Sequence, residues 1–486
     1  MHPNHAKFLA RAHALDRAGR GPEALAAYRD YLALEPRHAE AWADFAGQLL
    51  VLRQSKEAEA ACGKALALDP RNLSARINLG CVHMQEGQWE AALAQFRAVL
   101  AADPNRVDAR RALAECLLKA TRQDLAEQEL ARVIRQDPRC LEAHQLLGHI
   151  FYSQGRWEDF QTEIDRFQAL EPSSAYLEFE QGFLDLLFGR MPQGWEGHEA
   201  RLRIPGLVGP ARTFSQPAWQ GESFEGKTLL LCYEQGLGDT LMFIRYAPRV
   251  KALGGQVILE AQPSLAAVAA TCPGVDRVIP RGEPLPAFDL HASLLSLPWL
   301  FRTDLSTIPA EIPYLDVPPQ VPHRQVLSEL LALTQGRIRI GLVWAGNPNH
   351  KRDGERSIPA ATLAPLAALP EVAWFSFQLG RSDAPPFPDL VPLGPLLSDF
   401  SDTAYALSGM DLVITVDTAL AHLSGALGIP TLLLLTFQPD WRWMLDREDS
   451  PWYPSLHLYR QTEAGDWDSV LRRLVNDLAP QAPAQP

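Results

Sequence analysis

The stretch WEAALAQFRAVLAADP, residues 89–104, combines a helical run with a terminal acidic residue and proline, and versions of it recur along the first part of the chain. The proline returns every 34 residues, each time after an acidic residue, at Pro36, Pro70, Pro104, Pro138 and Pro172. Because proline cannot continue a helix, each one marks the end of a helical unit. The constant interval predicts a stack of repeated helix pairs.

Two further series share this register. Small residues recur where the two helices of a repeat would cross, and larger residues follow four positions later on the same helical face. The small residues are Ala24, Ala58, Ala92 and Ala126, with Phe160 breaking the series, and the larger ones are Tyr28, Cys62, Phe96, Leu130 and Ile164. A period of 34 is typical of tetratricopeptide repeats (TPR), whose solenoids hold partner proteins. We therefore expect residues 1–203 to be a protein-docking solenoid, closed by a degenerate capping unit from Ala175 that keeps Gly182 and Gly189.

Composition narrows the class of protein. The chain has 486 residues, of which 47% are hydrophobic and 21% charged, and its net charge is −13. This length favours several domains, and the acidic balance disfavours nucleic acid as a partner. No apolar run approaches the roughly 20 residues that span a bilayer, so we expect no membrane span. The six cysteines form no Cys-x-x-Cys pair, and the start of the chain lacks a signal-peptide pattern, so we expect a cytoplasmic protein with reduced thiols.

After residue 203 the periodicity changes. Residues 204–226 are rich in Pro, Gly and Ser, which predicts a linker. Apolar runs of strand length then alternate with helical stretches in two sets, which predicts two consecutive α/β domains with parallel sheets at 227–322 and 323–478. The predicted strands are Thr228–Cys232, Gln256–Ala261, Val275–Pro280, Ile338–Trp344, Val372–Gln378, Leu412–Val416 and Pro430–Leu435. Residues 479–486 are predicted to be a flexible tail.

Asp239 is the first candidate for chemistry. It follows the first predicted strand and the glycines Gly236 and Gly238, at the start of a helix. A carboxylate at the carboxyl end of a strand would face the cleft between two such domains, where ligands bind. The spacing alone favours the alternative, in which Asp239 is a helix N-cap.

A second cluster follows a buried strand and opens a helix: Asp417, Thr418, Ala419 and His422. The amino terminus of a helix offers free N–H groups and a partial positive charge, which suit a phosphate. Thr418 would donate to that phosphate, His422 lies one turn further on the same face, and Asp417 would accept from a sugar hydroxyl. Capping by Asp417 or Thr418, with His422 as a packing residue, remains the alternative.

A third cluster begins with Trp344, Gly346 and Asn347 after another strand, and continues with the cations Lys351, Arg352 and Arg356. Three cations there would stabilise the charge of a diphosphate leaving group, or would form a solvated loop. The carboxylates Asp466 and Asp468 open the last helix, which favours capping over metal binding. No cluster has convincing metal-ligand spacing, so no metal is predicted.

Together these motifs resemble a bacterial family in which TPR repeats precede a GT-B glycosyltransferase region similar to the ADP-heptose lipopolysaccharide heptosyltransferases. The segments that carry the resemblance are Glu234–Thr240, Pro286–Asp289, Leu294–Pro298, Gly341–Asn347, Arg356–Ser357, Val416–Ala419, Ala421–Leu423, Asp440–Trp443 and Ser450–Pro454. The implied fold is an all-α TPR solenoid followed by an α/β GT-B pair of Rossmann-like domains, with the acceptor on the first domain and the nucleotide sugar on the second.

The resemblance implies that Asp239 is the catalytic aspartate and that Asp417, Thr418 and His422 contact the nucleotide sugar. It leaves open which cation among Lys351, Arg352 and Arg356 faces the leaving group. It implies an inverting, metal-independent enzyme without a cofactor. Members with this layout include flagellin glycosyltransferases. The leading expectation is therefore transfer of a sugar to a Ser or Thr hydroxyl of a protein that is docked on the repeats, and flagellin is one such protein. Transfer to lipopolysaccharide or another glycan, and a scaffold without turnover, are the alternatives.

Overall fold

The computed structural model describes residues 3–208, 214–334, 336–350, 352–381, 383, 387 and 389–479. It divides into two compact units, Met1–Ser173 and Ser174–Pro486. Within the described ranges, no helix is both long enough and apolar enough to cross a bilayer.

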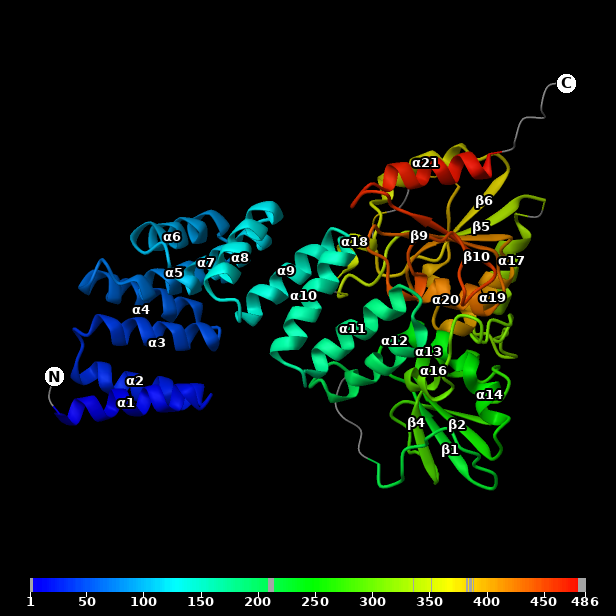
Figure 1. The fold of residues 1–486 in the computed structure, drawn as a ribbon. Helices are drawn as coiled ribbons and strands as arrows, with labels where there is room; N and C mark the ends of the chain where they lie inside the picture. Colours follow the sequence, from blue (N-terminus) through cyan, green and yellow to red (C-terminus); the bar gives the residue numbers. More distant parts are fainter. Residues whose placement is uncertain are drawn as a thin grey trace. The chain divides into compact units, whose positions relative to one another are not determined.

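The first unit consists of helices packed as successive antiparallel pairs, as the 34-residue interval predicts (Figure 1). Each of the five prolines lies just beyond a helix end; α6, for example, stops at Ala102 and Pro104 follows. The helices are α1 (Pro3–Arg17), α2 (Gly21–Leu34), α3 (Ala39–Val51), α4 (Ser55–Leu68), α5 (Leu73–Gln85), α6 (Trp89–Ala102), α7 (Val107–Lys119), α8 (Gln123–Gln136), α9 (Leu141–Ser153) and α10 (Trp157–Leu170). The predicted all-helical TPR-like solenoid is therefore confirmed.

The packing series of the repeats are buried as predicted. The four alanines of the small-residue series are fully buried, and so is Phe96 in the larger series. Phe96 fits against a glycine of the partner helix, since a Cβ atom on Gly80 would lie 2.5 Å from its ring. In the last pair the large ring moves by one turn, because Phe160 packs on Gly148, where a Cβ atom would lie 3.3 Å away. The break in the alanine series is thus compensated by that glycine.

The boundary between the units differs from the predicted one at residue 203. Helices α11 (Ala175–Leu187) and α12 (Met191–His198) and the 3-10 turn η1 (Glu199–Arg203) belong to the second unit. Trp195 of α12 is 1% exposed because its ring packs edge-on against Trp441 and Trp452, far along the chain. The capping pair is therefore part of the α/β unit rather than of the solenoid, and its aromatic contacts give the physical reason.

The first sheet has four parallel strands in the order β3-β2-β1-β4. They are β1 (Thr228–Cys232), β2 (Gln256–Ala261), β3 (Arg277–Pro280) and β4 (Leu290–Ser293). Two predicted strands, β1 and β2, have the observed bounds. The short helices around this sheet are α13 (Leu237–Phe243), η2 (Ile244–Tyr246), α14 (Ala247–Lys251), η3 (Pro263–Leu265), α15 (Ala266–Ala269), η4 (Leu294–Ser296) and α16 (Leu297–Leu300).

The described part of the predicted linker, residues 204–208 and 214–226, is more than a connection. Ala218 forms a parallel bridge with His291 of β4, and Trp219 and Phe224 are 2% and 1% exposed. Residues 214–226 therefore extend the first sheet beyond β4 and contribute to its core, because their aromatic side chains need burial that a free linker would not provide. Residues 209–213 lie outside the described ranges.

The second sheet has six parallel strands in the order β10-β9-β8-β5-β6-β7. They are β5 (Ile338–Val343), β6 (Val372–Ser376), β7 (Val391–Pro392), β8 (Leu412–Val416), β9 (Thr431–Leu435) and β10 (Leu456–Arg460). The residues of β6 are all buried, as expected for a parallel strand covered on both faces. The predicted parallel-sheet α/β region is confirmed, with β4, β7 and β10 in addition to the predicted strands.

Helices cover the second sheet, and Figure 1 shows α21 along one side of it. One core joins Trp467, Val470 and Leu471 of α21 to β5 and β8. Asp466 caps α21 by accepting from Ser469 N at 3.0 Å, which confirms its predicted capping role. The helices are α17 (Arg324–Ala332), α18 (Asp353–Arg356), η5 (Ala360–Ala368), η6 (Gly394–Leu396), α19 (Phe400–Ser408), α20 (Ala419–Ala426), η7 (Trp441–Trp443) and α21 (Trp467–Leu478).

Candidate active site

Each sheet reverses its strand order beside a central strand. In the first sheet the chain leaves β1 for β2 on one side and returns to β4 on the other; in the second it leaves β5 for β6 and returns to β8. Ligands of open α/β sheets bind at such reversal points, outside the carboxyl ends of the strands. Asp239 lies in the first turn of the helix that follows β1, and Asp417 lies in the loop after β8, so both predicted carboxylates lie at positions suited to ligand binding.

The loop after β1 holds Asp239 in a defined position. Gln235 adopts a positive φ of 57°, and Gly236 is the N-cap of α13. The amide N–H of Gly236 donates to Asp239 Oδ2 at 2.8 Å, which satisfies a backbone donor at the helix start. Asp239 is therefore the third residue of the helix and closes this turn; it is not the N-cap that the spacing favoured. Its other carboxylate oxygen points away from the turn.

That second oxygen, Asp239 Oδ1, accepts from Arg442 Nη2. Arg442 belongs to η7, which follows β9 of the second sheet, and its Nη1 donates to Asp440 Oδ1 at 2.7 Å. The guanidinium also lies 4.3 Å from the ring centroid of Trp441. The side chains of Asp239 and Arg442 are 15% and 11% exposed, so this ion pair between the loops of the two sheets is largely shielded from water.

The pKa values of both members of this ion pair are shifted. Burial raises the pKa of Asp239 above its ordinary value, although the charge of Arg442 opposes the shift. Burial also opposes the charge on Arg442, but Asp440 and Asp239 outweigh it and raise the pKa of the guanidinium. Asp239 can accept a proton, and Arg442 carries a permanent positive charge beside it.

Asp417 and Thr418 follow β8. Burial raises the pKa of Asp417 to about 6, and the negative charge of Asp440 adds to the shift. Thr418 is the N-cap of α20, and its Oγ1 accepts from Leu420 N at 3.3 Å. The capping alternative is therefore confirmed for Thr418, whose neighbour Ala419 is the first residue of the helix. Asp417 lies just before the cap, within the field of Arg442 and Arg356.

His422 is 5% exposed and lies within the site. Its Nδ1 is 2.9 Å from the hydroxyl of Tyr453, and its ring stacks on Trp443 with centroids 5.4 Å apart. Burial lowers its pKa well below the ordinary value, and the charges of Arg442 and Arg245 add to the effect. These effects favour the neutral imidazole, which can donate or accept a hydrogen bond.

Arg245 of η2 joins the two sheet domains next to His422. Its side chain is buried, its Nη2 donates to Tyr314 Oη at 2.9 Å, and its Nη1 donates to the carbonyl of Trp452. The guanidinium also lies 4.3 Å from the ring centroid of Tyr453. These contacts link the first sheet domain to the loop before β10.

Of the two described cations that were predicted to face a leaving group, Arg356 is the one that contacts the loop after β8. Its Nη1 donates to the carbonyl of Asp417 at 3.1 Å, and its Nε lies 3.4 Å from Asp353 Oδ1. Arg352 Nη2 instead donates to the carbonyl of Gln438 at 2.9 Å. Lys351 lies outside the described residues. The geometry thus distinguishes Arg356 from Arg352 by its contact with the strand end that carries Asp417.

The other predicted site residues after β5 are Gly346, Asn347 and Trp344, and they lie in different environments. Only glycine fits at position 346 without displacing its neighbours, because a Cβ atom there would lie 2.5 Å from both Arg356 Nη2 and Asp353 Oδ1. Asn347 is exposed, and its Oδ1 accepts from Asn349 N at 3.0 Å, which closes a turn. Trp344 was predicted to contact the nucleotide sugar, and its side chain is 2% exposed within the core of the second sheet.

A buried arginine bridges the carboxyl ends of β1 and β4 in the first sheet. Arg201 of η1 is 0% exposed, its Nε donates to Glu234 Oε2 at 2.9 Å, and its Nη2 donates to Ser296 Oγ at 2.9 Å. Glu234 follows β1 and Ser296 follows β4, so the guanidinium lies between the two strand ends. Arg201 also donates to Glu199, so two carboxylates contact the one guanidinium. The turn that leads to Asp239 is thus anchored from the helix pair that precedes the sheet.

Sequence reasoning missed Arg201, Arg245 and Arg442 as site residues. Arg442 had a detectable signal, since it belongs to Asp440–Trp443, one of the segments that carry the family resemblance. Arg201 and Arg245 carried no comparable signal because their partners lie far along the chain. Within the described residues, no group of three or more His, Cys, Asp or Glu side chains is arranged to hold a metal ion.

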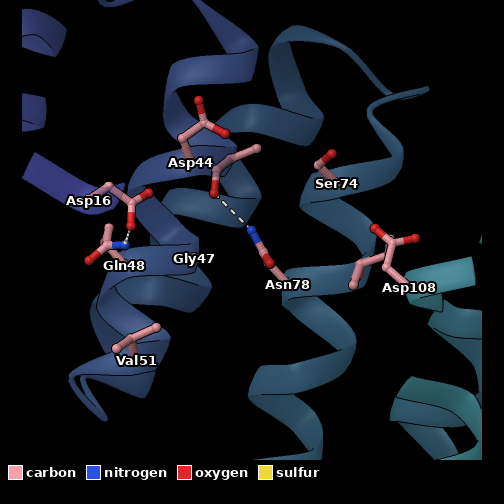
Figure 2. A pocket seen from close by; sticks show the side chains of 10 residues that line it. Asp16, Asp44, Gly47, Gln48, Val51, Ser74, Asn78 and Asp108 are labelled. Carbon is pink, nitrogen blue, oxygen red and sulfur yellow. Dashed lines mark hydrogen bonds between the residues drawn. The ribbon is translucent and has the colours of Figure 1, made fainter. Parts of the chain in front are cut away.

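The first unit carries a separate hollow, shown in Figure 2. Its volume is about 290 Å³, and it is lined by residues from α1, α3, α5 and α7. Asp16 accepts from Gln48, and Asn78 Nδ2 donates to the carbonyl of Ala43 at 2.8 Å (Figure 2). The hollow is therefore polar and formed by consecutive helix pairs.

The helical repeats and the parallel sheets define a repeat-containing protein with an α/β region. Residues 83–150 match the family model described as tetratricopeptide repeat. The chain is similar to Protein FlbA of Caulobacter vibrioides, with 28% identity over 334 residues that cover 63% of this chain and 55% of that protein. It therefore spans about half the length of this relative.

Two solved structures resemble the chain over part of its length. One is PilF of Pseudomonas aeruginosa, with 18% identity and a TM-score of 0.36, over 42% of this chain and 91% of that one. The other is PilW, described as a widely conserved type IV pilus biogenesis factor, with 21% identity and a TM-score of 0.38, over 42% of this chain and 94% of that one.

Proposed function

We propose that this protein is a GT-B glycosyltransferase that moves a sugar from a nucleotide-activated donor to a Ser or Thr hydroxyl of a protein held by the repeats. The observation that carries the proposal is that Asp239, Arg442 and Asp417 interact, although they follow strands of two separate parallel sheets. A carboxylate beside a fixed cation at such loops suits a reaction that removes a proton and releases a phosphate. The sequence resemblance supports the same reaction class.

In this proposal, Asp239 takes the proton of the acceptor hydroxyl while that oxygen attacks the anomeric carbon. The bond from the anomeric carbon to the phosphate oxygen breaks, and its electron pair leaves with the phosphate. The amino terminus of α20, near Thr418, and the cation Arg356 stabilise that phosphate. Attack opposite the leaving group inverts the anomeric configuration, as the resemblance implies, without a metal cofactor.

The repeats supply the acceptor. Tetratricopeptide repeats bind proteins, and the hollow lined by α1, α3, α5 and α7, with a volume of about 290 Å³, offers polar groups for such contacts. Docking raises the local concentration of the acceptor near the site, so weakly binding hydroxyls are modified. Flagellin is the acceptor that the sequence resemblance suggests.

The test compares protein masses in the native host. We would express the intact protein, Asp239→Ala and the control Asp468→Ala, which replaces an exposed aspartate on α21. Intact mass spectrometry of flagellin and other abundant secreted appendage proteins should show a sugar-sized increment with the first and third proteins but not with Asp239→Ala. Equal masses in all three strains would contradict protein glycosylation.

A second measurement separates the other classes of function. Hydrolysis of a nucleotide sugar that requires Asp239, together with unchanged protein masses, would indicate a glycan acceptor. The absence of both activities would indicate a scaffold. Cross-linking of full-length Asp239→Ala to flagellin, followed by peptide mapping, should place cross-links on α1–α10 if the repeats hold the acceptor.

A further inference from the structure

Arg442 connects the proposed base to the donor side of the site. It contacts Asp239 of the first sheet domain through Nη2 and Asp440 of its own loop through Nη1. It also interacts with the charge of Asp417, and the ring of Trp441 supports it at 4.3 Å. The guanidinium therefore lies between the carboxylate that would take a proton and the loop that would hold the donor.

We propose that Arg442 is a catalytic residue that exchanges its contact with Asp239 for a phosphate group of the donor, so that donor binding frees the base. This inference rests on the proposed function. Only one end of the guanidinium has to move in this exchange. Nη1 keeps its hydrogen bond to Asp440, and the ring of Trp441 stays against the guanidinium.

The chemistry of the two partners favours this exchange. A carboxylate that accepts a hydrogen bond from a guanidinium holds its lone pair in that bond and is a weaker base for a hydroxyl. A phosphate offers more oxygen acceptors and more negative charge to the planar guanidinium than a single carboxylate oxygen does. A bound donor phosphate therefore competes with Asp239 Oδ1 for Nη2.

The reaction then follows without any further reagent. With Nη2 on the phosphate, Asp239 takes the proton of the acceptor hydroxyl, and the acceptor oxygen forms a bond to the anomeric carbon. As the bond to the phosphate oxygen breaks, that oxygen gains an electron pair and a negative charge. Arg442 balances this charge. After the nucleotide leaves and Asp239 releases its proton to water, Nη2 returns to the Asp239 carboxylate.

Calorimetric titration of the full-length protein tests the exchange. The probes are ADP, GDP, UDP and CMP, each titrated into the wild type, Arg442→Gln, Asp239→Asn and the double variant. Arg442→Gln should weaken the nucleotide that binds by about 10- to 100-fold, because it loses charge-assisted hydrogen bonds. Asp239→Asn should tighten it by about 3- to 10-fold, since the competing carboxylate is gone.

The double variant provides the decisive comparison. If the carboxylate acts by competing for the guanidinium, Asp239→Asn should have no effect once Arg442 is Gln. Arg447→Gln is the matched control, because this arginine lies near Arg442 in the chain and pairs with Asp449 at 2.7 Å. It should bind nucleotide like the wild type. Arg442→Lys, which keeps the charge, and a melting curve for each variant guard against misfolding.

The outcomes separate the two proposals. Nucleotide binding that Asp239→Asn leaves unchanged or weakens would overturn the role of Arg442 while leaving the enzyme class intact. Equal binding by the wild type and a folded Arg442→Gln would do the same. A wild type that binds none of the four nucleotides would overturn the proposed function itself.

Discussion

Gly238 of α13 lies directly against the imidazole of His422 of α20, and a Cβ atom on this glycine would lie 2.7 Å from Cδ2 of the ring. The two residues follow central strands of different sheets, so their contact sets how closely the two sheet domains approach. The ring cannot retreat, because it stacks on Trp443 and Tyr453 lies 2.9 Å from its Nδ1. The glycine of the Gly238–Asp239 motif is thus required by packing.

Gly238→Ala should therefore destabilise the second unit. We expect a loss of about 1–3 kcal/mol in the free energy of unfolding, the usual cost of overpacking a filled contact. Denaturant unfolding followed by tryptophan fluorescence measures it. Gly354→Ala is the control, since a Cβ atom at that glycine meets no heavy atom within 4 Å. Equal stability of the two variants would contradict the steric role of Gly238.

Asp239→Ala should reduce transfer by about 10²- to 10⁴-fold, because the reaction loses its general base. Steady-state kinetics with the identified donor and acceptor measure the rate, and the melting temperature reports on folding. Asp468→Ala, on the exposed side of α21, should transfer at the wild-type rate. Near-normal turnover by a folded Asp239→Ala would remove this residue from the mechanism.

Asp417 should make stability depend on pH. Its folded pKa of about 6 lies above the ordinary value of 3.8, so between these values the folded state keeps a proton that the unfolded state has lost. The stabilising contribution is full below the ordinary value and is lost as the pH rises through about 6. Relative to Asp417→Asn, the melting temperature of the wild type should therefore fall as the pH is raised from about 4 to 7.

Asp276 provides the opposite case. Although burial opposes the shift, the Lys251 ammonium and the amide of Val257 hold the pKa of Asp276 below its ordinary value. Its contribution is present above the ordinary value and is lost as the pH falls through the lower, folded value. The difference between the wild type and Asp276→Asn should stay constant from about pH 5 to 7. A parallel response of Asp276→Asn and Asp417→Asn would contradict the assigned shifts.

Arg201→Met should destabilise the second unit by about 3–5 kcal/mol, because Glu199 and Glu234 would keep their charges without the guanidinium that pairs with them. Hydrogen exchange should become faster in the turn at Gly236, which Glu234 precedes. Arg203→Met is the neighbouring control: its side chain is 55% exposed and pairs with Glu178, so the expected cost is about 0–1 kcal/mol. Similar losses in both variants would show that the buried contacts of Arg201 have no special weight.

Local sequence predicted the elements whose signal is repeated or continuous. The solenoid follows from prolines and packing residues in one register, and β1, β2 and β8 are apolar runs with the predicted bounds. The strand β4 escaped prediction because Leu290–Ser293 is short and partly polar, and its pairing with β1 supplies what the local pattern lacks. The boundary between the units also differs from the predicted one, because Trp195 packs against aromatic residues far along the chain, and no local pattern predicts such contacts.

The sequence by itself determined the repeat architecture, the presence of parallel sheets, and the strand ends at which Asp239 and Asp417 lie, because helix and strand periodicity and turn residues are properties of neighbouring residues. The tertiary structure alone decided which distant side chains meet. Arg442 reaches Asp239 across 203 positions of the chain, and Trp344 turns into the core. Such contacts depend on how whole sheets pack, which leaves no local pattern in the sequence.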